Sequence, residues 1–251
     1  MKARWLISCG NFFFRFRNGL FPLFMLLAAL IARPLLPMGS ERANNITDLV
    51  GAAITLTGQF VRCFTIGFKY IKRGGKNKQV YADDLVVGGI FAHSRNPMYV
   101  GNLLIFLGVT VVVHSPLLYA VGIPLIGFIY AAIIAAEENF LRGKFGAQFD
   151  DYCARVPRLI PNLAGIRSSL AGHAFQWRRV LLKEFGTLTA SLVGLVAIRM
   201  WSLHLILGAK AGPEIHAWAW AFLPIGLFYI TIYTLKKTRR LTESPSPAVP
   251  G

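Results

Sequence analysis

The 251-residue chain is poor in cysteine, histidine and acidic residues, and each shortage argues against a class of protein. Its three cysteines (Cys9, Cys63 and Cys153) are too few and too far apart for a disulfide framework or a CxxC site. Its five histidines form no HxxxH or HExxH cluster, which argues against a zinc protease of that type and against a di-iron desaturase. We therefore expect no metal centre.

The shortage of acids leaves a net charge of +16, with 27 Lys and Arg against 11 Asp and Glu. Such a charge suggests nucleic-acid binding, but its distribution points to a membrane. If the N-terminus is cytoplasmic, 22 of the basic residues fall on the cytoplasmic side of the apolar blocks, two fall on the opposite side and three fall within the blocks. This asymmetry is the one that the positive-inside rule describes. We expect a membrane partner and no nucleic acid.

What the chain has in abundance is long apolar blocks, each close to the roughly 17–25 residues needed to cross a bilayer. Six such blocks lie at about 20–38, 47–68, 98–114, 116–136, 188–208 and 216–235. The sequence therefore predicts an all-α polytopic membrane bundle of about six spans, with both termini in the cytoplasm. A basic residue within the second block, Arg62, either extends to the interface or faces a polar cavity.

The blocks and the charge pattern divide the chain into six parts. These are a basic interfacial arm (1–19), two spans with a basic loop (20–84), a core with a helical hairpin (85–161), a cytoplasmic amphipathic segment (162–187), two further spans (188–240) and a polar, proline-rich tail that we expect to be disordered (241–251).

The first polar cluster of the core precedes the third span. Pro97 suits the first turn of a helix, so the span should begin there with Asn96 as its N-cap. A helix start beside Arg95 is a natural site for a carboxylate or phosphate. The same pattern also fits a capped helix with an arginine on the positive side of the membrane.

The second cluster ends the fourth span with two consecutive acids, Glu137 and Glu138. Neighbouring helical positions point about 100° apart, so one carboxylate can face the bundle. Glu138 also stands four residues before Arg142, as in a surface ion pair. If the hairpin folds back, both clusters meet in a pocket suited to a zwitterionic, net-cationic cofactor.

The order and spacing of these clusters resemble the membrane methyltransferases, namely the isoprenylcysteine carboxyl methyltransferases and the related phospholipid N-methyltransferases. The residues that carry the resemblance are Gly89-x-Phe91-xxx-Arg95-Asn96-Pro97-Met98-Tyr99-x-Gly101, then Glu137-Glu138-xx-Leu141-xxx-Phe145-Gly146-xxxxx-Tyr152-xxx-Val156-Pro157-Arg158-x-Ile160-Pro161. The family usually has Arg-His-Pro where this chain has Asn96, and asparagine cannot titrate. The resemblance covers about 85–161.

The resemblance implies that S-adenosylmethionine binds at the cytoplasmic face in a site that is not a Rossmann domain. No GxGxxG motif follows a predicted strand, which agrees with that. We predict two catalytic residues, Arg95 and Glu138. The predicted cofactor-binding residues are His93, Asn96, Pro97, Tyr99, Gly101 and Glu137.

Methyl transfer is an in-line displacement that depends mainly on alignment. Arg95 would orient a carboxylate acceptor, whereas an amine acceptor must lose a proton to Glu137 or Glu138. The sequence predicts a lipid or lipidated acceptor that enters from the bilayer, and it leaves open which acceptor and which oligomeric state. Two alternatives are a sterol-reductase-like membrane oxidoreductase and a non-catalytic lipid-binding or assembly protein.

Overall fold

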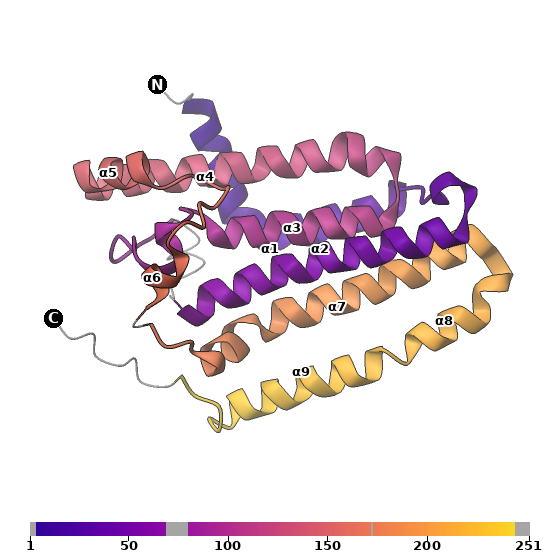
Figure 1. The fold of residues 1–251 in the computed structure, drawn as a ribbon. Coiled ribbons are helices and arrows are strands. Elements are labelled where there is room, and N and C mark those ends of the chain that lie inside the picture. Colours follow the sequence, from indigo (N-terminus) through magenta and orange to yellow (C-terminus); the bar gives the residue numbers. More distant parts are fainter. Residues whose placement is uncertain (1–3, 69–79, 172, 244–251) are drawn as a thin grey trace.

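A computed structural model describes residues 4–68, 80–171 and 173–243, and these form an all-helical bundle without strands (Figure 1). The all-α prediction is confirmed. Most of the predicted basic loop (69–79) and most of the predicted disordered tail (244–251) lie outside the described residues.

The long helices are α1 (Arg4–Ile31), α2 (Glu41–Phe68), α3 (Pro97–Val113), α4 (Ile123–Phe145), α7 (Trp177–Leu207) and α9 (Phe222–Lys237). The shorter helices are α5 (Ala147–Arg155), α6 (Ile166–Leu170) and α8 (Gly212–Ala219). Single turns of 3-10 helix occur at η1 (Pro37–Gly39), η2 (Gly89–Ala92) and η4 (Gly208–Ala211), and a π-helical turn, η3 (Leu118–Gly122), leads into α4.

In the part of the chain that the structure describes, four helical segments are long and apolar enough to cross a membrane: Arg4–Ile31, Glu41–Phe68, Leu118–Phe145 and Trp177–Lys237. The last is a run of 61 residues that contains α7, α8 and α9, and α3 is a shorter apolar helix. Each of the six predicted blocks thus contains helix. The number of crossings and the sidedness of the termini stay predictions.

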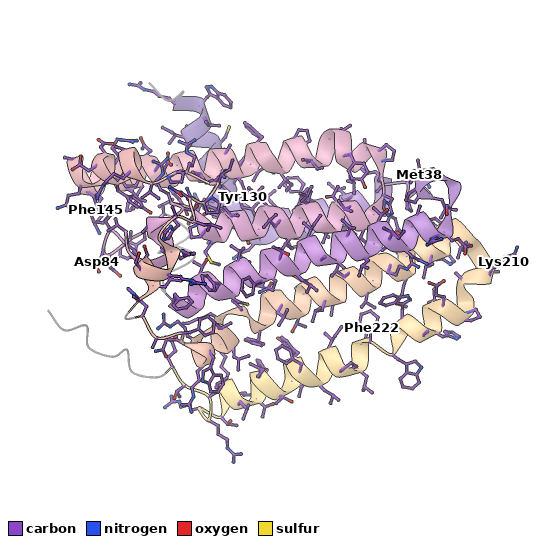
Figure 2. The ribbon with its side chains drawn as sticks, viewed as in Figure 1. Met38, Asp84, Tyr130, Phe145, Lys210 and Phe222 are labelled. Carbon is purple, nitrogen blue, oxygen red and sulfur yellow. The ribbon has the colours of Figure 1, made fainter. Side chains whose placement is uncertain are left out.

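The two ends of the bundle differ in what they carry. Asp84 and Phe145 lie at one end, and Met38 and Lys210 lie at the other (Figure 2). Helix α1 begins and α9 ends at the same end as α5 and α6 (Figure 1). The start of α1 and the end of α9 therefore lie on one side of the bundle.

The first helix joins the predicted basic arm to the first apolar block. Helix α1 runs without a break from Arg4 to Ile31, so it contains most of 1–19 and the start of 20–38. The helix ends shortly before Pro34, and a residue that precedes proline is disfavoured in the α conformation. The basic and aromatic segment is therefore part of the bundle.

Glycines bring α2 and α3 into close contact. A Cβ atom on Gly58 would lie 2.5 Å from the carbonyl oxygen of Gly101, and one on Gly108 would lie 2.4 Å from that of Gly51. Small residues at such a crossing allow two backbones to approach. The predicted tight hairpin of the third and fourth spans is therefore only part of the packing, because α3 packs most extensively along α2 and α4 along α1.

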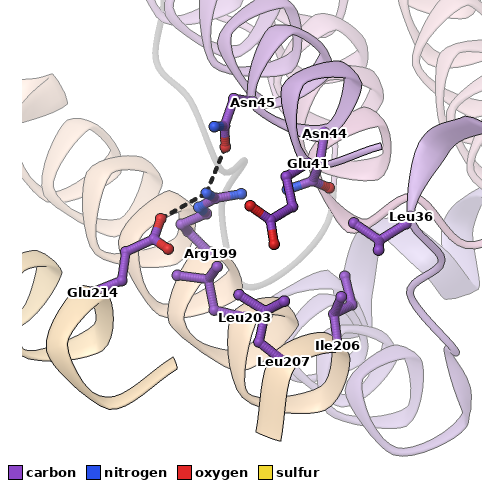
Figure 3. Close-up of a pocket in the computed structure, with 9 residues that line it drawn as sticks. All are labelled: Leu36, Glu41, Asn44, Asn45, Arg199, Leu203, Ile206, Leu207 and Glu214. Carbon is purple, nitrogen blue, oxygen red and sulfur yellow. Dashed lines mark hydrogen bonds and ion pairs between the residues drawn. The ribbon is translucent and has the colours of Figure 1, made fainter. Parts of the chain in front are cut away.

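A separate polar cluster, centred on Arg199, joins α2, α7 and α8 at the end of the bundle that carries Met38. The guanidinium of Arg199 pairs with Asp48 and Glu214 and donates to Asn45 Oδ1 at 2.7 Å (Figure 3). The adjoining cavity measures about 30 Å³, which is close to the volume of one water molecule in the liquid. This cluster fastens the helices on the side of the bundle away from the two polar clusters of the core.

The close contact of α2 and α3 yields a stability prediction. We call it the glycine seam, and its residues are Gly51, Gly58, Gly101 and Gly108. Gly58→Ala should destabilise the protein by about 1–3 kcal/mol, since the new methyl group overpacks the α2–α3 contact. Gly127→Ala is the matched control, because a Cβ atom there meets nothing within 4 Å. Thermal unfolding in detergent measures both variants, and equal melting temperatures would contradict the seam.

Candidate active site

The two polar clusters of the core line one cavity of about 930 Å³. This volume falls within the range of roughly 300–1,000 Å³ typical of small-molecule sites. Its walls come from α1, α2, α3, α4, α5, α7 and the segment 80–86. Of the predicted site residues, those on the wall are Arg95, Asn96, Pro97, Tyr99, Glu137 and Glu138.

The loop that carries the first cluster is fastened to the segment after α5 by backbone hydrogen bonds. Arg95 N–H donates to Pro157 O at 2.9 Å, and Asn162 N–H donates to His93 O at 2.9 Å. Ser94 Oγ donates to Leu159 O at 3.1 Å. These bonds fix the approach to α3, so the direction of Arg95 is set by two chain segments.

Glu138 lies between two arginines. Its carboxylate is 3.2 Å from Arg95 Nη2 and accepts two hydrogen bonds from Arg158, from Nε at 3.0 Å and from Nη2 at 2.5 Å. The Glu138 side chain is 4% exposed. The expected surface pair with Arg142 is not formed, because Arg142 instead donates to Asp150 at 2.6 Å. The inward-facing alternative for Glu138 is confirmed.

The neighbouring carboxylate has a different partner. Tyr99 O–H donates to Glu137 Oε1 at 2.7 Å, and the Tyr99 ring lies 5.4 Å from that of Tyr130. The two consecutive acids thus serve different parts of the wall. Glu138 holds the arginines, and Glu137 faces the aromatic side.

Asn96 occupies the N-cap position of α3, but its side chain makes no capping hydrogen bond. The capping prediction is corrected, because Asn96 Nδ2 donates to Arg158 O at 3.0 Å. The amide therefore holds the backbone of the residue whose guanidinium binds Glu138. An amide performs this task without titrating.

The other predicted residues near the cluster have different surroundings. Pro97 forms the first turn of α3, as predicted. His93 is buried, with Nδ1 2.5 Å from Asn162 O, and does not line the cavity. Gly101 lies in the seam with α2, where a Cβ atom would lie 2.6 Å from Arg62 Cγ. The structure thus brings neither His93 nor Gly101 to the cavity wall.

Arg62 also lines the cavity, and its charge is paired within the bundle. It binds Glu184 of α7 through Nε at 2.9 Å and Nη2 at 3.1 Å, and it donates to Asn102 of α3. Both side chains of the ion pair are at least nine-tenths buried. The alternative in which Arg62 extends to the interface is therefore wrong, and the one in which it faces a polar cavity is confirmed.

The composition of the wall suits a zwitterionic, net-cationic cofactor. Arg95 Nε is buried and makes no hydrogen bond within the described part of the chain, so this cavity-lining guanidinium retains a donor. Carboxylates for positive groups and rings for an aromatic base line the same space. Outside the spans, burial raises the pKa of the Tyr152 phenol, whose O–H donates to Phe91 O at 2.7 Å and steadies the wall.

Comparison with known proteins shows which family the core resembles. Residues 47–148 match the model of the phospholipid methyltransferase family. The predicted resemblance is therefore confirmed. The matched segment runs from α2 through α3 and α4 to the start of α5, and it includes the seam, both acids and Arg95.

Three curated relatives match shorter stretches. The nickel-cobalt-cadmium resistance protein NccN of Alcaligenes xylosoxydans xylosoxydans is 33% identical over 34% of this chain and 39% of its own. The cobalt-zinc-cadmium resistance protein CzcN of Cupriavidus metallidurans is 32% identical over 43% and 51%. Protein-S-isoprenylcysteine O-methyltransferase B of Arabidopsis thaliana is 31% identical over 31% and 39%.

The chain thus spans about half or less of the length of these relatives. No solved structure matches it.

Sequence reasoning assigned no role to Arg158, Arg17 and Thr187. Arg158 binds Glu138, which lines the cavity; it was part of the quoted motif, and its position between two prolines was a usable signal. Arg62, a charge within an apolar block, was left open between the interface and a polar cavity. Arg17 and Thr187 also line the cavity, from helices outside the matched segment, and nothing in the sequence linked them to it.

The ion cluster of Glu138 with Arg95 and Arg158, here called the Glu138 clamp, yields a second stability prediction. Glu138→Gln should destabilise the protein by roughly 3–5 kcal/mol, because two arginines would then face each other without an anion. Asp150→Asn removes an acid from an ion pair whose side chains are 40% and 55% exposed, and it should cost under about 1 kcal/mol. Chemical unfolding in detergent tests both, and equal effects would refute the clamp.

Proposed function

We propose that the chain is an integral membrane methyltransferase that uses S-adenosylmethionine and methylates a lipid or lipidated acceptor at the cytoplasmic face. The observation that carries this proposal is the shared cavity, to which Arg95 and Glu138 contribute from one side and Tyr99 and Glu137 from the other. The family match covers all four of these residues, and the surrounding helices are apolar enough for a bilayer.

The wall offers a place for each part of the donor. Arg95 would bind the donor carboxylate through charge-assisted hydrogen bonds, with the backbone around Asn96 and Pro97 beside it. Tyr99 and Glu137 would line the space for its positive groups. When bound there, S-adenosylmethionine supplies an electrophilic methyl group on a positively charged sulfur.

The two acids differ in what they do for the acceptor. Glu138 is engaged by Arg95 and Arg158 through its two ion pairs, whereas Glu137 accepts a hydrogen bond from Tyr99 only within the described contacts. We therefore assign Glu138 a positioning role. Glu137 would accept the proton that an amine acceptor must lose. A carboxylate acceptor needs no proton removal.

The charge distribution supports the cytoplasmic assignment. Asp84, which lines the cavity, lies at one end of the bundle (Figure 2), and this is the end where α1 begins and α9 ends (Figure 1). The basic residues of the arm, the core motifs and the tail belong to that end, and positive loops face the cytoplasm.

The names of two relatives refer to metal resistance. Within residues 4–68, 80–171 and 173–243, no group of three or more His, Cys, Asp or Glu side chains is arranged to hold a metal ion. The proposal therefore assigns this cavity to a methyl donor and its acceptor.

A labelling experiment tests the function. Purified protein is incubated with methyl-labelled S-adenosylmethionine, total membrane lipids and a prenylcysteine analogue, and the labelled product is identified by mass. We expect label in a lipid or in the prenylcysteine analogue, and treatment with base separates labile methyl esters from stable methylamines. Reductant-dependent turnover without methyl transfer would favour the oxidoreductase, and donor-free lipid binding alone would favour the non-catalytic protein.

Donor binding yields a third prediction. Arg95→Gln should weaken S-adenosylmethionine binding about tenfold or more, since a hydrogen bond to a charged group contributes roughly 1.5–3 kcal/mol. Arg142→Gln is the matched control, because the side chain of Arg142 is 40% exposed and forms its ion pair with Asp150 of α5. Titration calorimetry in detergent measures both affinities. An unchanged affinity in Arg95→Gln would remove this residue from the donor site.

A further inference from the structure

One face of α1 forms part of the cavity, although α1 lies outside the family-matched segment. Phe14, Arg17, Asn18 and Phe21 line the space. Their spacing of three, four and seven residues places them on one side of a helix. The first helix therefore contributes a polar pair between two aromatic rings to the site.

Arg17 is held in place but keeps its hydrogen-bond donors. Its guanidinium carbon lies 4.2 Å from the centre of the Phe14 ring, and Phe14 is buried in the α1–α4 contact. Within the described residues no carboxylate pairs with Arg17, in contrast to Arg62 and Arg95. A stacked guanidinium still presents its planar fork to a carboxylate or phosphate.

The position of α1 indicates which kind of molecule can reach the guanidinium of Arg17. Only Gly10 and Phe14 of its described residues are buried, and large apolar side chains on its other faces point outward. Helix α1 is thus an outer wall between the cavity and the bilayer. An arginine on an apolar helix is costly unless it faces a polar space, and such residues usually mark a substrate path.

Arg17 lines the same cavity as Glu137 and Tyr99, the residues assigned to its reacting side. An oxyanion bound to Arg17 would therefore bring the neighbouring atoms of the same molecule towards Glu137. The donor carboxylate already has Arg95, which belongs to the matched core.

We propose that Arg17 binds the oxyanion, phosphate or carboxylate, of the amphiphilic methyl acceptor. This inference rests on the proposed methyltransferase function and adds an acceptor contact on α1. The acceptor class is then an amphiphile with an anionic group close to its methylated atom, rather than a neutral lipid.

Direct binding tests the assignment without turnover. Purified protein in a non-ionic detergent is titrated with a short-chain phosphatidylethanolamine, with N-acetyl-farnesylcysteine and with the uncharged methyl ester of the latter. Arg17→Gln is compared with Arg15→Gln, an exposed arginine that is stacked on Phe16 of the same helix and does not line the cavity. Arg17→Met also removes the charge and serves as the second variant if the glutamine protein does not fold. Donor affinity is measured in parallel.

We expect wild type and Arg15→Gln to bind one anionic amphiphile alike, and Arg17→Gln to bind it at least about tenfold more weakly. The methyl ester should bind the variants equally, and donor affinity should not change. The titrations with the phosphatidylethanolamine and with N-acetyl-farnesylcysteine show whether the bound oxyanion is a phosphate or a carboxylate.

Unchanged binding of both oxyanion-bearing amphiphiles by Arg17→Gln, or by Arg17→Met if only that variant folds, would overturn the proposal. Loss of donor affinity in place of acceptor affinity would also overturn it, as would a wild type that binds neither anion. Normal anion binding through Arg17 with no methyl transfer would instead contradict the proposed function alone.

Discussion

The ion cluster of Glu138 with Arg95 and Arg158 is the contact on which the rest of the site depends. Its three members come from the end of α4, from the loop before α3 and from the segment after α5. A carboxylate that is 4% exposed is stable as a charge only if it is paired, and the two guanidiniums provide this. Because Glu138 joins these segments, the direction of Arg95 and the shape of the cavity follow from its ionisation.

Around this cluster the bundle divides its tasks among contacts of different kinds. The glycine seam of α2 and α3 fixes the scaffold by close packing of the two backbones. The Arg62–Glu184 pair joins α7, which lies outside the family match, to the core beside the cavity. Helix α1 closes the outer side and offers Arg17. The chain beyond the matched segment thus completes the walls of the site.

The sequence predicted what depends on composition and local chemistry. The apolar blocks indicated the helices, Pro97 indicated the start of α3, and the spacing of the two clusters indicated that Arg95 and the paired acids would meet. It did not predict which helix packs on which, because the α2–α3 seam depends on glycines far apart in the chain. It also placed Arg17 in an interfacial arm, since nothing local shows that α1 continues across the cavity. Asn96 was interpreted as a cap, and only the distant carbonyl of Arg158 explains its actual hydrogen bond.

The central claim is that this cavity holds the methyl donor. Ultraviolet crosslinking of labelled S-adenosylmethionine to the purified protein, followed by peptide mapping, tests it most directly. The account predicts saturable labelling of peptides within 80–102 and 130–152, which unlabelled donor competes away. Labelling confined to 188–240, or the absence of saturable labelling, would contradict it.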